Sequence, residues 1–254
     1  MLAATPGSRH DDTIQMKVRT VRGGLSRDGG RIAAACTGLP FRTRDVIELS
    51  NYYTLSSPWA YFAGPKLQDI VRRHRAKLML KPFDFQAVVP KTGGIPLRTR
   101  PEPRRKYHAL ELARWRDYLG MPLKLSPRYY PIDGLPEGWN KPAGWMVIAA
   151  QQRGDDAFVL SNAMLRALWV EERDIADPSV RQAIADENGL NGAALVAAEK
   201  SAEVQAIYRR NSEEALALGV FGSPTIVLDG EIFWGQDRLD FVDRALALRA
   251  RRIE

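Results

Sequence analysis

Strand-like and helix-like patterns follow one another along this chain in an order that few sheet topologies can accommodate. Two short strands separated by a helix come early, and a second pair joined by a tight Asp229-Gly230 turn comes near the end. The predicted elements are strands over 46–53 and 77–83, a helix over 58–75, a hairpin over 223–234 and a final helix over 237–251. Strands joined by a helix are parallel, whereas a hairpin adds antiparallel strands. All four strands can therefore share one sheet only if the chain between the pairs is an insertion.

The intervening chain carries helical patterns rather than strands. After a loop over 90–96, helices are predicted over 103–119, 142–152, 155–171, 178–188, 192–198 and 199–218. The order predicts an α/β chain with a thioredoxin-like fold and a large helical insertion. We expect a thioredoxin-like domain made of residues 46–85 and 199–254, and a mostly helical insertion domain over residues 86–198.

Residues 1–45 differ in composition from the rest of the chain. They are rich in Gly, Arg, Ser and Thr, and up to residue 44 eight basic and three acidic side chains give a net charge of +5. Such a segment cannot bury a core, so a disordered extension is predicted. A targeting segment and a start site assigned too far upstream remain as alternatives. Because the segment lacks the apolar stretch of a secretory signal, we predict a cytoplasmic protein.

Composition argues against several classes of function. The single cysteine, Cys36, and three histidines make a disulfide within the chain impossible and a metal site built from these residues unexpected. No apolar run approaches the roughly 20 residues that span a bilayer. Beyond residue 44 the net charge is only +2, which disfavours nucleic-acid binding by the folded part.

The first candidate site is the start of the first predicted helix, Ser57-Pro58-Trp59-Ala60. Serine caps free backbone N–H groups, and proline is favoured at the first helical position. Thioredoxin-fold oxidoreductases carry a Cys-x-x-Cys pair here, and because both sulfurs are absent, dithiol redox chemistry is excluded. Ser57 has two interpretations: a helix cap alone, or a hydrogen-bond donor that stabilises a ligand's thiolate together with the helix dipole.

Two further motifs lie towards the C-terminal end. In Gly222-Ser223-Pro224-Thr225, a cis Pro224 would turn the Ser223 backbone towards a peptide ligand, and the alternative is a trans proline at a strand edge. Trp234-Gly235-Gln236-Asp237 opens the last helix. Asp237 either caps that helix or joins Gln236 in binding the charged amino-acid end of a ligand.

In combination these motifs resemble the 2-hydroxychromene-2-carboxylate isomerase family. That family is related to kappa-class glutathione transferases and to DsbA-type thioredoxin folds. The resemblance covers about residues 46–250, and it is carried by Tyr53–Phe62, the Thr92–Pro96 loop, Gly219–Thr225 and Phe233–Arg238.

The resemblance implies a glutathione-dependent enzyme. The roles of the family's site residues are assigned to the matching positions of this chain. Ser57 matches the catalytic serine at the glutathione sulfur, and Ser223 with Pro224 matches the pair that anchors the tripeptide. The stretch around the γ-glutamyl end is matched by Trp234, Gly235, Gln236 and Asp237. The Lys91–Gly94 loop matches a loop that bears on the second substrate. The family commonly has Asn where this chain has Gly94, and this departure bears on which substrate is used.

The implied reaction is the isomerisation of an unsaturated aromatic keto acid. A thiolate adds to the conjugated system, turns a double bond into a rotatable single bond and leaves after rotation. Cations must hold the substrate carboxylate and the developing enolate. Among Lys91, Arg98, Arg100 and Arg128 we favour Lys91 because it lies in the matching loop, and the basic stretch 98–106 is expected to face solvent.

Aromatic side chains and partners complete the expectations. Tyr129 is a candidate substrate contact, and it could form an aromatic wall with Trp59, Trp115 and Tyr130, although each is as readily scaffold. The expected partner is a small aromatic carboxylate. No nucleic acid or membrane is expected, and a homodimer is implied by the resemblance alone.

Two other functions remain open. A kappa-like glutathione transferase or peroxidase would share the glutathione site and differ in the pocket for the second substrate. A non-catalytic thioredoxin-fold protein would bind a peptide or partner protein at the Pro224 edge and would have no affinity for glutathione.

Overall fold

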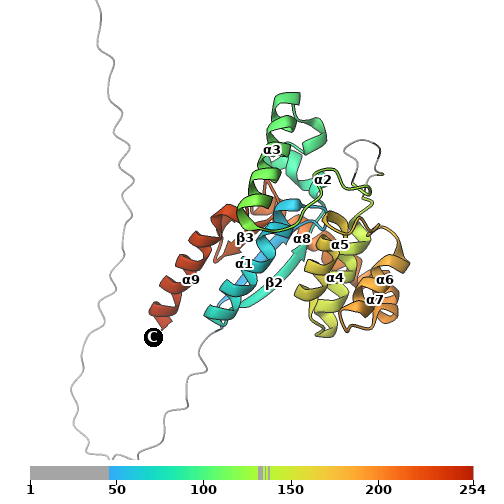
Figure 1. The fold of residues 1–254 in the computed structure, drawn as a ribbon. Coiled ribbons are helices and arrows are strands. Elements are labelled where there is room, and N and C mark those ends of the chain that lie inside the picture. The colour runs from blue at the N-terminus through green and yellow to red at the C-terminus, as the bar shows by residue number, and fades with distance from the viewer. Residues whose placement is uncertain (1–45, 131–133, 135, 137, 254) are drawn as a thin grey trace, which may run out of the picture. The chain divides into compact units, whose positions relative to one another are not determined.

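The computed structural model describes residues 46–130, 134, 136 and 138–253 (Figure 1). The extension expected over residues 1–45 lies outside these residues.

A four-stranded mixed sheet has the order β2-β1-β3-β4. Its strands are β1 (Glu48–Tyr53), β2 (Lys77–Pro82), β3 (Thr225–Leu228) and β4 (Glu231–Trp234). β1 is parallel to β2 and antiparallel to β3, so that Ser50 is paired with Met79 on one side and with Val227 on the other. β3 and β4 form the expected antiparallel hairpin. The mixed sheet is confirmed, with β3 starting one residue after Pro224, which has no N–H for the ladder.

α1 (Pro58–His74) connects the two parallel strands. It begins where predicted, because Ser57 is extended and its Oγ accepts a hydrogen bond from the Ala60 N–H at 3.2 Å. It ends at Arg75, whose φ of 50° turns the chain out of the helix. The last helix starts later than expected. Residues Gln236–Arg238 form a 3₁₀ turn, η3, and α9 follows over Leu239–Ile253.

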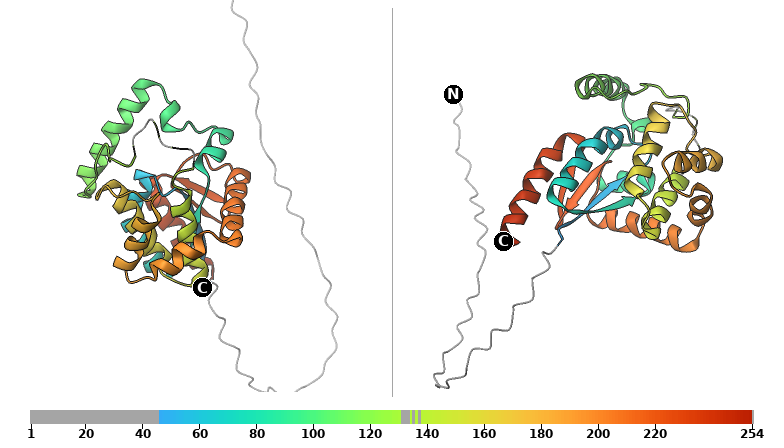
Figure 2. Two further views of the ribbon diagram at one scale, coloured as in Figure 1. Left: turned by 90° about the vertical axis from the view of Figure 1, so that its right-hand side faces the viewer. Right: turned by 60° about the horizontal axis from the view of Figure 1, so that its bottom comes forward.

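Helices cover both faces of the sheet (Figure 2). α1 and α9 lie side by side on one face, in a buried cluster made of Leu49, Leu67, Ile70, Ile226, Leu228, Val242 and Leu246. α8 (Ala202–Ala217) packs on the opposite face, in a cluster that contains Tyr52, Phe83, Val88, Ala215, Val220 and Val227.

The connection between β2 and α8 is helical, as predicted (Figure 1). Its elements are α2 (Phe85–Val88), η1 (Val89–Thr92), η2 (Leu97–Thr99), α3 (Glu102–Leu119), α4 (Lys141–Arg153), α5 (Ala157–Trp169), α6 (Pro178–Glu187) and α7 (Gly192–Glu199). The part of the predicted 90–96 loop nearest α2 is the 3₁₀ turn η1. Asp156, Asp177 and Asn191 cap α5, α6 and α7 through side-chain oxygens.

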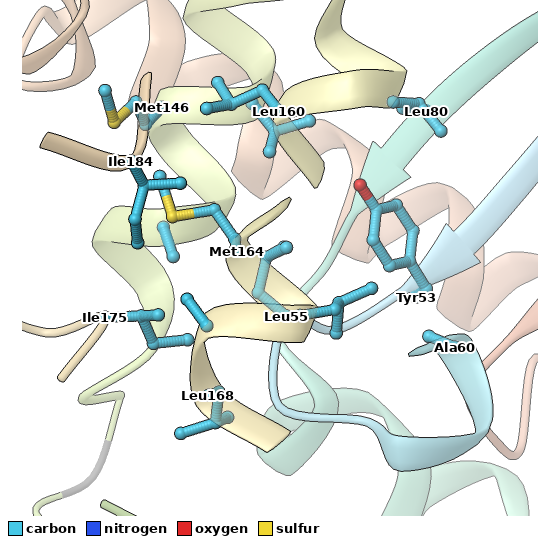
Figure 3. Close-up of a cluster of buried hydrophobic side chains, with 14 of the residues drawn as sticks. Tyr53, Leu55, Ala60, Leu80, Met146, Leu160, Met164, Leu168, Ile175 and Ile184 are labelled. Carbon is cyan, nitrogen blue, oxygen red and sulfur yellow. The ribbon is translucent and has the colours of Figure 1, made fainter. Parts of the chain in front are cut away.

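The largest buried cluster joins these helices to the sheet (Figure 3). Tyr53 of β1 and Leu80 of β2 lie beside Leu160 of α5, and the Tyr53 hydroxyl is hydrogen-bonded to Ser161 Oγ at 2.7 Å. Leu55 belongs to the same cluster. This core fixes the segment between β1 and α1, where the first candidate site residue lies. The division into two domains stays a prediction.

Candidate active site

Ser57 is held between a helix and a distant loop. Its Oγ accepts the Ala60 N–H and donates to the Ser223 carbonyl oxygen at 3.0 Å, and its side chain is almost completely buried. Ser57 is therefore a helix cap, as one interpretation proposed, and the same hydroxyl also reaches the loop before β3. The two interpretations are compatible, since a hydroxyl hydrogen can rotate between acceptors.

The Ser223-Pro224 peptide bond is cis, as expected for this motif. Ser223 Oγ accepts a hydrogen bond from the Thr54 N–H at 3.0 Å, and the Pro224 carbonyl accepts one from the Gly235 N–H at 2.9 Å. The Ser223 N–H makes no hydrogen bond with another described residue. An unpaired backbone donor in a buried position is suited to a peptide ligand's carbonyl.

Ser57 and Ser223 open on a cavity of about 640 Å³, within the usual size range of small-molecule sites. The predicted residues that line it are Ser57, Ser223, Trp234, Gly235, Gln236 and Asp237. Pro224 lies directly behind Ser223 and is not part of the lining. Six of the ten predicted site residues therefore surround one space, although they come from α1, the loop before β3 and the turn after β4.

The turn after β4 forms one wall of this cavity. Trp234 is half-exposed and packs edge-on against Phe221, with ring centroids 4.9 Å apart. Gln236 is buried. The 3₁₀ turn starts after Gly235 without a side-chain cap, so Asp237 lies inside the turn rather than capping it, and its carboxylate accepts a hydrogen bond from Arg238 at 2.7 Å.

Lys91, Gly94 and Tyr129 are not among the described residues that line the cavity. The loop that contains Lys91 and Gly94 contacts the site indirectly, because Thr92 Oγ1 donates to the Val220 carbonyl oxygen at 2.7 Å. A Cβ placed on Gly94 would lie 2.3 Å from the Phe221 carbonyl oxygen. The loop thus supports the segment that precedes Ser223. The substrate contacts assigned to these three residues stay predictions.

Replacing Gly94 by asparagine, the residue common in the resembling family, is expected to destabilise this protein by about 1–3 kcal/mol. The new side chain would push against the Phe221 carbonyl and the Val89 side chain. Urea denaturation measures the effect, with Lys91→Asn, an exposed change in the same loop, as the matched control. An unchanged unfolding free energy in the Gly94 variant would contradict the tight packing.

The basic stretch was expected to face solvent, which holds for part of it, and three of its arginines also line the cavity: Arg98, Arg100 and Arg104. Arg98 and Arg104 are exposed, whereas Arg100 is half-buried. Three carboxylates also line the cavity, and each is paired with another cation, in Asp84–Lys141 at 2.6 Å, Glu111–Arg114 at 2.7 Å and Asp237–Arg238 at 2.7 Å. The three arginines have no carboxylate of a described residue within ion-pair distance.

Aromatic side chains form much of the remaining wall. Trp59, Trp115 and Tyr130 line the cavity as proposed, and Trp139 joins them. The Tyr130 and Trp139 rings are 6.1 Å apart. Burial raises the pKa of Tyr130, so its phenol stays protonated at neutral pH. The cavity therefore combines flat apolar surfaces with positive charge.

Asn140 and His108 are among the lining residues that sequence reasoning missed. Asn140 donates from Nδ2 to Thr54 Oγ1 at 2.6 Å and to Ser56 Oγ at 2.8 Å, and so fixes the segment before Ser57. His108 of α3 packs edge-on against Trp59 with ring centroids 5.5 Å apart. No motif marks either residue, because both are brought to the site by the packing of helices far away in sequence.

Among the described residues, no cluster of His, Cys, Asp and Glu has the composition and spacing needed to hold a metal ion. In the same part of the chain, no helix is both long and apolar enough to cross a membrane.

Comparisons with known proteins agree with this geometry. Residues 48–247 match the model of the DSBA-like thioredoxin domain. A 2-hydroxychromene-2-carboxylate isomerase of Sphingobium xenophagum is 31% identical over 77% of this chain and 95% of its own length. Glutathione S-transferase kappa 2 of Caenorhabditis elegans is 30% identical over 77% of this chain and 90% of its own.

Solved structures show the same fold. A 2-hydroxychromene-2-carboxylate isomerase superposes with a TM-score of 0.66 at 23% identity, covering 81% of this chain and 97% of the other. The cytosolic disulfide reductase DsbM of Pseudomonas aeruginosa, solved with GSH, gives a TM-score of 0.57 at 20% identity, covering 79% and 100%.

Proposed function

Because the chain belongs to the DsbA-like thioredoxin family, in the branch that holds 2-hydroxychromene-2-carboxylate isomerases and kappa-class glutathione transferases, we propose that it is a glutathione-dependent isomerase. Its substrate would be an unsaturated aromatic keto acid. The observation that carries the proposal is the position of Ser57, whose hydroxyl lies at the N-terminus of α1 and borders an aromatic, cationic cavity. A cytoplasmic location and a homodimer stay predictions.

The residues present fit glutathione. The tripeptide backbone would pair with the unpartnered Ser223 N–H beside the cis Pro224. The γ-glutamyl end would lie at the turn that holds Gln236 and Asp237, both of which line the cavity. When bound, glutathione would supply a thiolate that adds reversibly to the conjugated substrate and so makes its double bond rotatable.

Ser57 would lower the pKa of that thiol in two ways. Its hydroxyl hydrogen, now donated to the Ser223 carbonyl, can turn towards a sulfur placed in the cavity. The first-turn N–H groups of α1 also carry partial positive charge, which favours an anion at this end. No carboxylate lies in the first turn of α1 to oppose this effect.

The arginine wall would hold the second substrate. Arg98, Arg100 and Arg104 offer positive charge without a competing carboxylate from any described residue. Such groups bind a substrate carboxylate and stabilise an enolate oxygen as charge develops there. The aromatic rings of Trp59 and Tyr130 would keep water from the reacting bond.

The test is the absorbance change of 2-hydroxychromene-2-carboxylate with the purified full-length protein, with and without glutathione. We expect isomerisation that depends on glutathione, because none of the described residues that line the cavity is a cysteine that could replace it. S-methylglutathione, which lacks the thiol, is the matched control and should not support turnover. An equal rate without glutathione would contradict the proposal.

A kappa-like glutathione transferase is the second candidate, favoured by the 30% identity to the nematode kappa-class enzyme. A transferase would use the same thiolate to attack an electrophilic substrate, and the sulfur would remain bonded to the product. Conjugation of 1-chloro-2,4-dinitrobenzene, measured beside the isomerase assay, separates the two activities. If the protein shows turnover in neither assay and does not bind glutathione, the remaining candidate is a non-catalytic binding protein of the same fold.

A further inference from the structure

Arg100 is a half-buried cation whose charge has no partner in the described part of the chain. Its Nε donates to the Ile95 carbonyl oxygen at 2.8 Å, and no described carboxylate is within ion-pair distance. Burial, and then the charge of Arg104, lower the pKa of Arg100. Arg181, by contrast, is fully buried but paired with Glu199. A partly desolvated guanidinium with no counter-charge from a described residue is suited to an anionic ligand.

His108 lies next to this charge on the same wall. Burial, and then the charge of Arg100, lower its pKa to about 4, so the ring is neutral at pH 7. Its ring packs against Trp59 and makes no hydrogen bond with a described residue. His108 is one of the residues that line the cavity, and no hydrogen bond from its ring nitrogens to a described residue competes with a ligand there.

The charged residues that line the cavity with His108 do not favour protonation of its ring. In the stretch from η2 to α3, which contains His108, the charged lining residues are Arg98, Arg100, Arg104 and Glu111, and Glu111 is paired with Arg114. Asp84, Asp237 and Arg238 lie elsewhere in the lining, and both carboxylates are paired with cations. Trp59 of α1, which contacts the ring, carries no charge.

A guanidinium beside a neutral imidazole has a definite chemical complement. The guanidinium binds a carboxylate in a fork, and the imidazole can donate one hydrogen bond to, or accept one from, a neighbouring uncharged oxygen. A carboxylate with a hydroxyl or carbonyl group one or two atoms away offers both. A simple carboxylate would use Arg100 and leave His108 unpaired.

We propose that Arg100 and His108 form the specificity-determining pair for the second substrate, with the carboxylate on Arg100 and the adjacent hydroxyl or carbonyl oxygen on His108. This inference deepens the proposed function, since it names the residues that select the acid. It differs from the sequence-based choice, which placed the substrate cation at Lys91.

The two sites are thermodynamically linked. An anion on Arg100 offsets the positive charge that lowers the pKa of His108, so binding should raise that pKa. By reciprocity, the anion binds more tightly when His108 is protonated. Because this effect needs neither glutathione nor turnover, it can be measured even if the isomerase assay fails.

The test is an NMR titration of the histidine ring protons of the full chain, with and without saturating salicylate. The chain has only three histidines, so the signals are readily assigned by substitution. We expect salicylate to raise the pKa of His108 by about one unit. The ring-proton signals of His74, whose ring contacts Asp243, should not respond to salicylate. An unchanged His108 pKa at saturating salicylate would overturn the inference.

Variants identify the two partners. Arg100→Gln should weaken salicylate binding by about tenfold or more and abolish the His108 shift. Lys106→Gln, on an exposed position of α3 that pairs with Glu102, is the matched control and should bind normally. Equal affinity in Arg100→Gln and the wild type would contradict the anion site.

The role of His108 is tested by comparing salicylate with benzoate, which lacks the neighbouring hydroxyl. His108→Phe should lose the preference for salicylate while keeping benzoate affinity. In the isomerase assay, His108→Gln should raise KM for the acid and leave KM for glutathione unchanged. If His108→Phe loses affinity for salicylate and benzoate alike and also has a lower Tm, the role of His108 is structural. That result would overturn the assignment of His108 to substrate selection.

Discussion

Replacing Ser57 by alanine is expected to lower kcat/KM for the glutathione-dependent isomerisation by a factor of about 10² to 10³. The substitution removes the hydroxyl that caps α1, at the helix end where the sulfur would lie. Removing a donor to a developing or full anion commonly has an effect of this size. The thiolate absorbance of bound glutathione should fall in parallel, because the thiol would revert towards its ordinary pKa.

The same substitution removes a helix cap, so stability must be separated from chemistry. Loss of the Ser57 cap should lower the free energy of unfolding by about 1 kcal/mol. Ser201→Ala is a matched control, since Ser201 caps α8 in the same way and does not line the cavity. It should reproduce the loss of stability with full activity. Activity of Ser57→Ala within threefold of wild type would contradict a role at the sulfur.

Replacing Glu199 by alanine is expected to lower the free energy of unfolding by about 3–5 kcal/mol. Arg181 and Glu199 form an ion pair that is buried on all sides, with side chains 2% and 1% exposed. Arg181 Nε donates to Glu199 Oε2 at 3.0 Å. Removing the carboxylate leaves a buried guanidinium without a counter-charge, which costs far more than the net value of the pair.

A double variant separates the charge from the hydrogen bonds. In Arg181→Met/Glu199→Leu the unpaired charge is gone, so much of the lost stability should return. The recovery should be incomplete, because Arg181 also donates to the carbonyl oxygens of Ile175 and Ala176. Urea denaturation gives these values, and Glu102→Ala in the exposed pair with Lys106 should change stability by less than about 0.5 kcal/mol. A loss under about 1 kcal/mol in Glu199→Ala would contradict the argument.

The fold was predictable where local signals are strong. Ser57-Pro58 marks the start of α1, and Asp229-Gly230 marks the hairpin turn, because each depends on the residue's own conformational preferences. The cis Ser223-Pro224 bond was expected from the place of this proline at the start of a strand in this fold, with a trans bond as the alternative. The parallel direction of β1 and β2 then followed from the rule that a helical connection makes neighbouring strands parallel, whereas the order of the strands in the sheet was not predicted.

The candidate site was only partly predictable, since its cationic wall depends on tertiary packing. Apolar spacing correctly predicted α3, but Tyr107 and Leu110 of that pattern are exposed and only Leu112 is buried. Periodicity therefore could not show which side of the helix faces the cavity. His108 and Asn140 reach the site from elements that no short motif connects to Ser57. The choice of Lys91 over Arg100 depended on a matching loop, and loop position does not fix where a long side chain ends.

The bond between Ser57 Oγ and the Ser223 carbonyl links residues 166 positions apart in the chain. During synthesis β1 and α1 emerge first, yet the central partner of β1 and the carbonyl that orients Ser57 come from the last part of the chain. The growing chain thus passes most of its synthesis with an open sheet edge and an incomplete pocket. A molecule that stops before β3 would lack the part of the cavity wall formed by Ser223 and the residues from Trp234 to Asp237. Only chains in which translation has reached the C-terminal hairpin could then bind the ligand. The fraction of chains with an occupied site would therefore measure how many are full-length and correctly assembled.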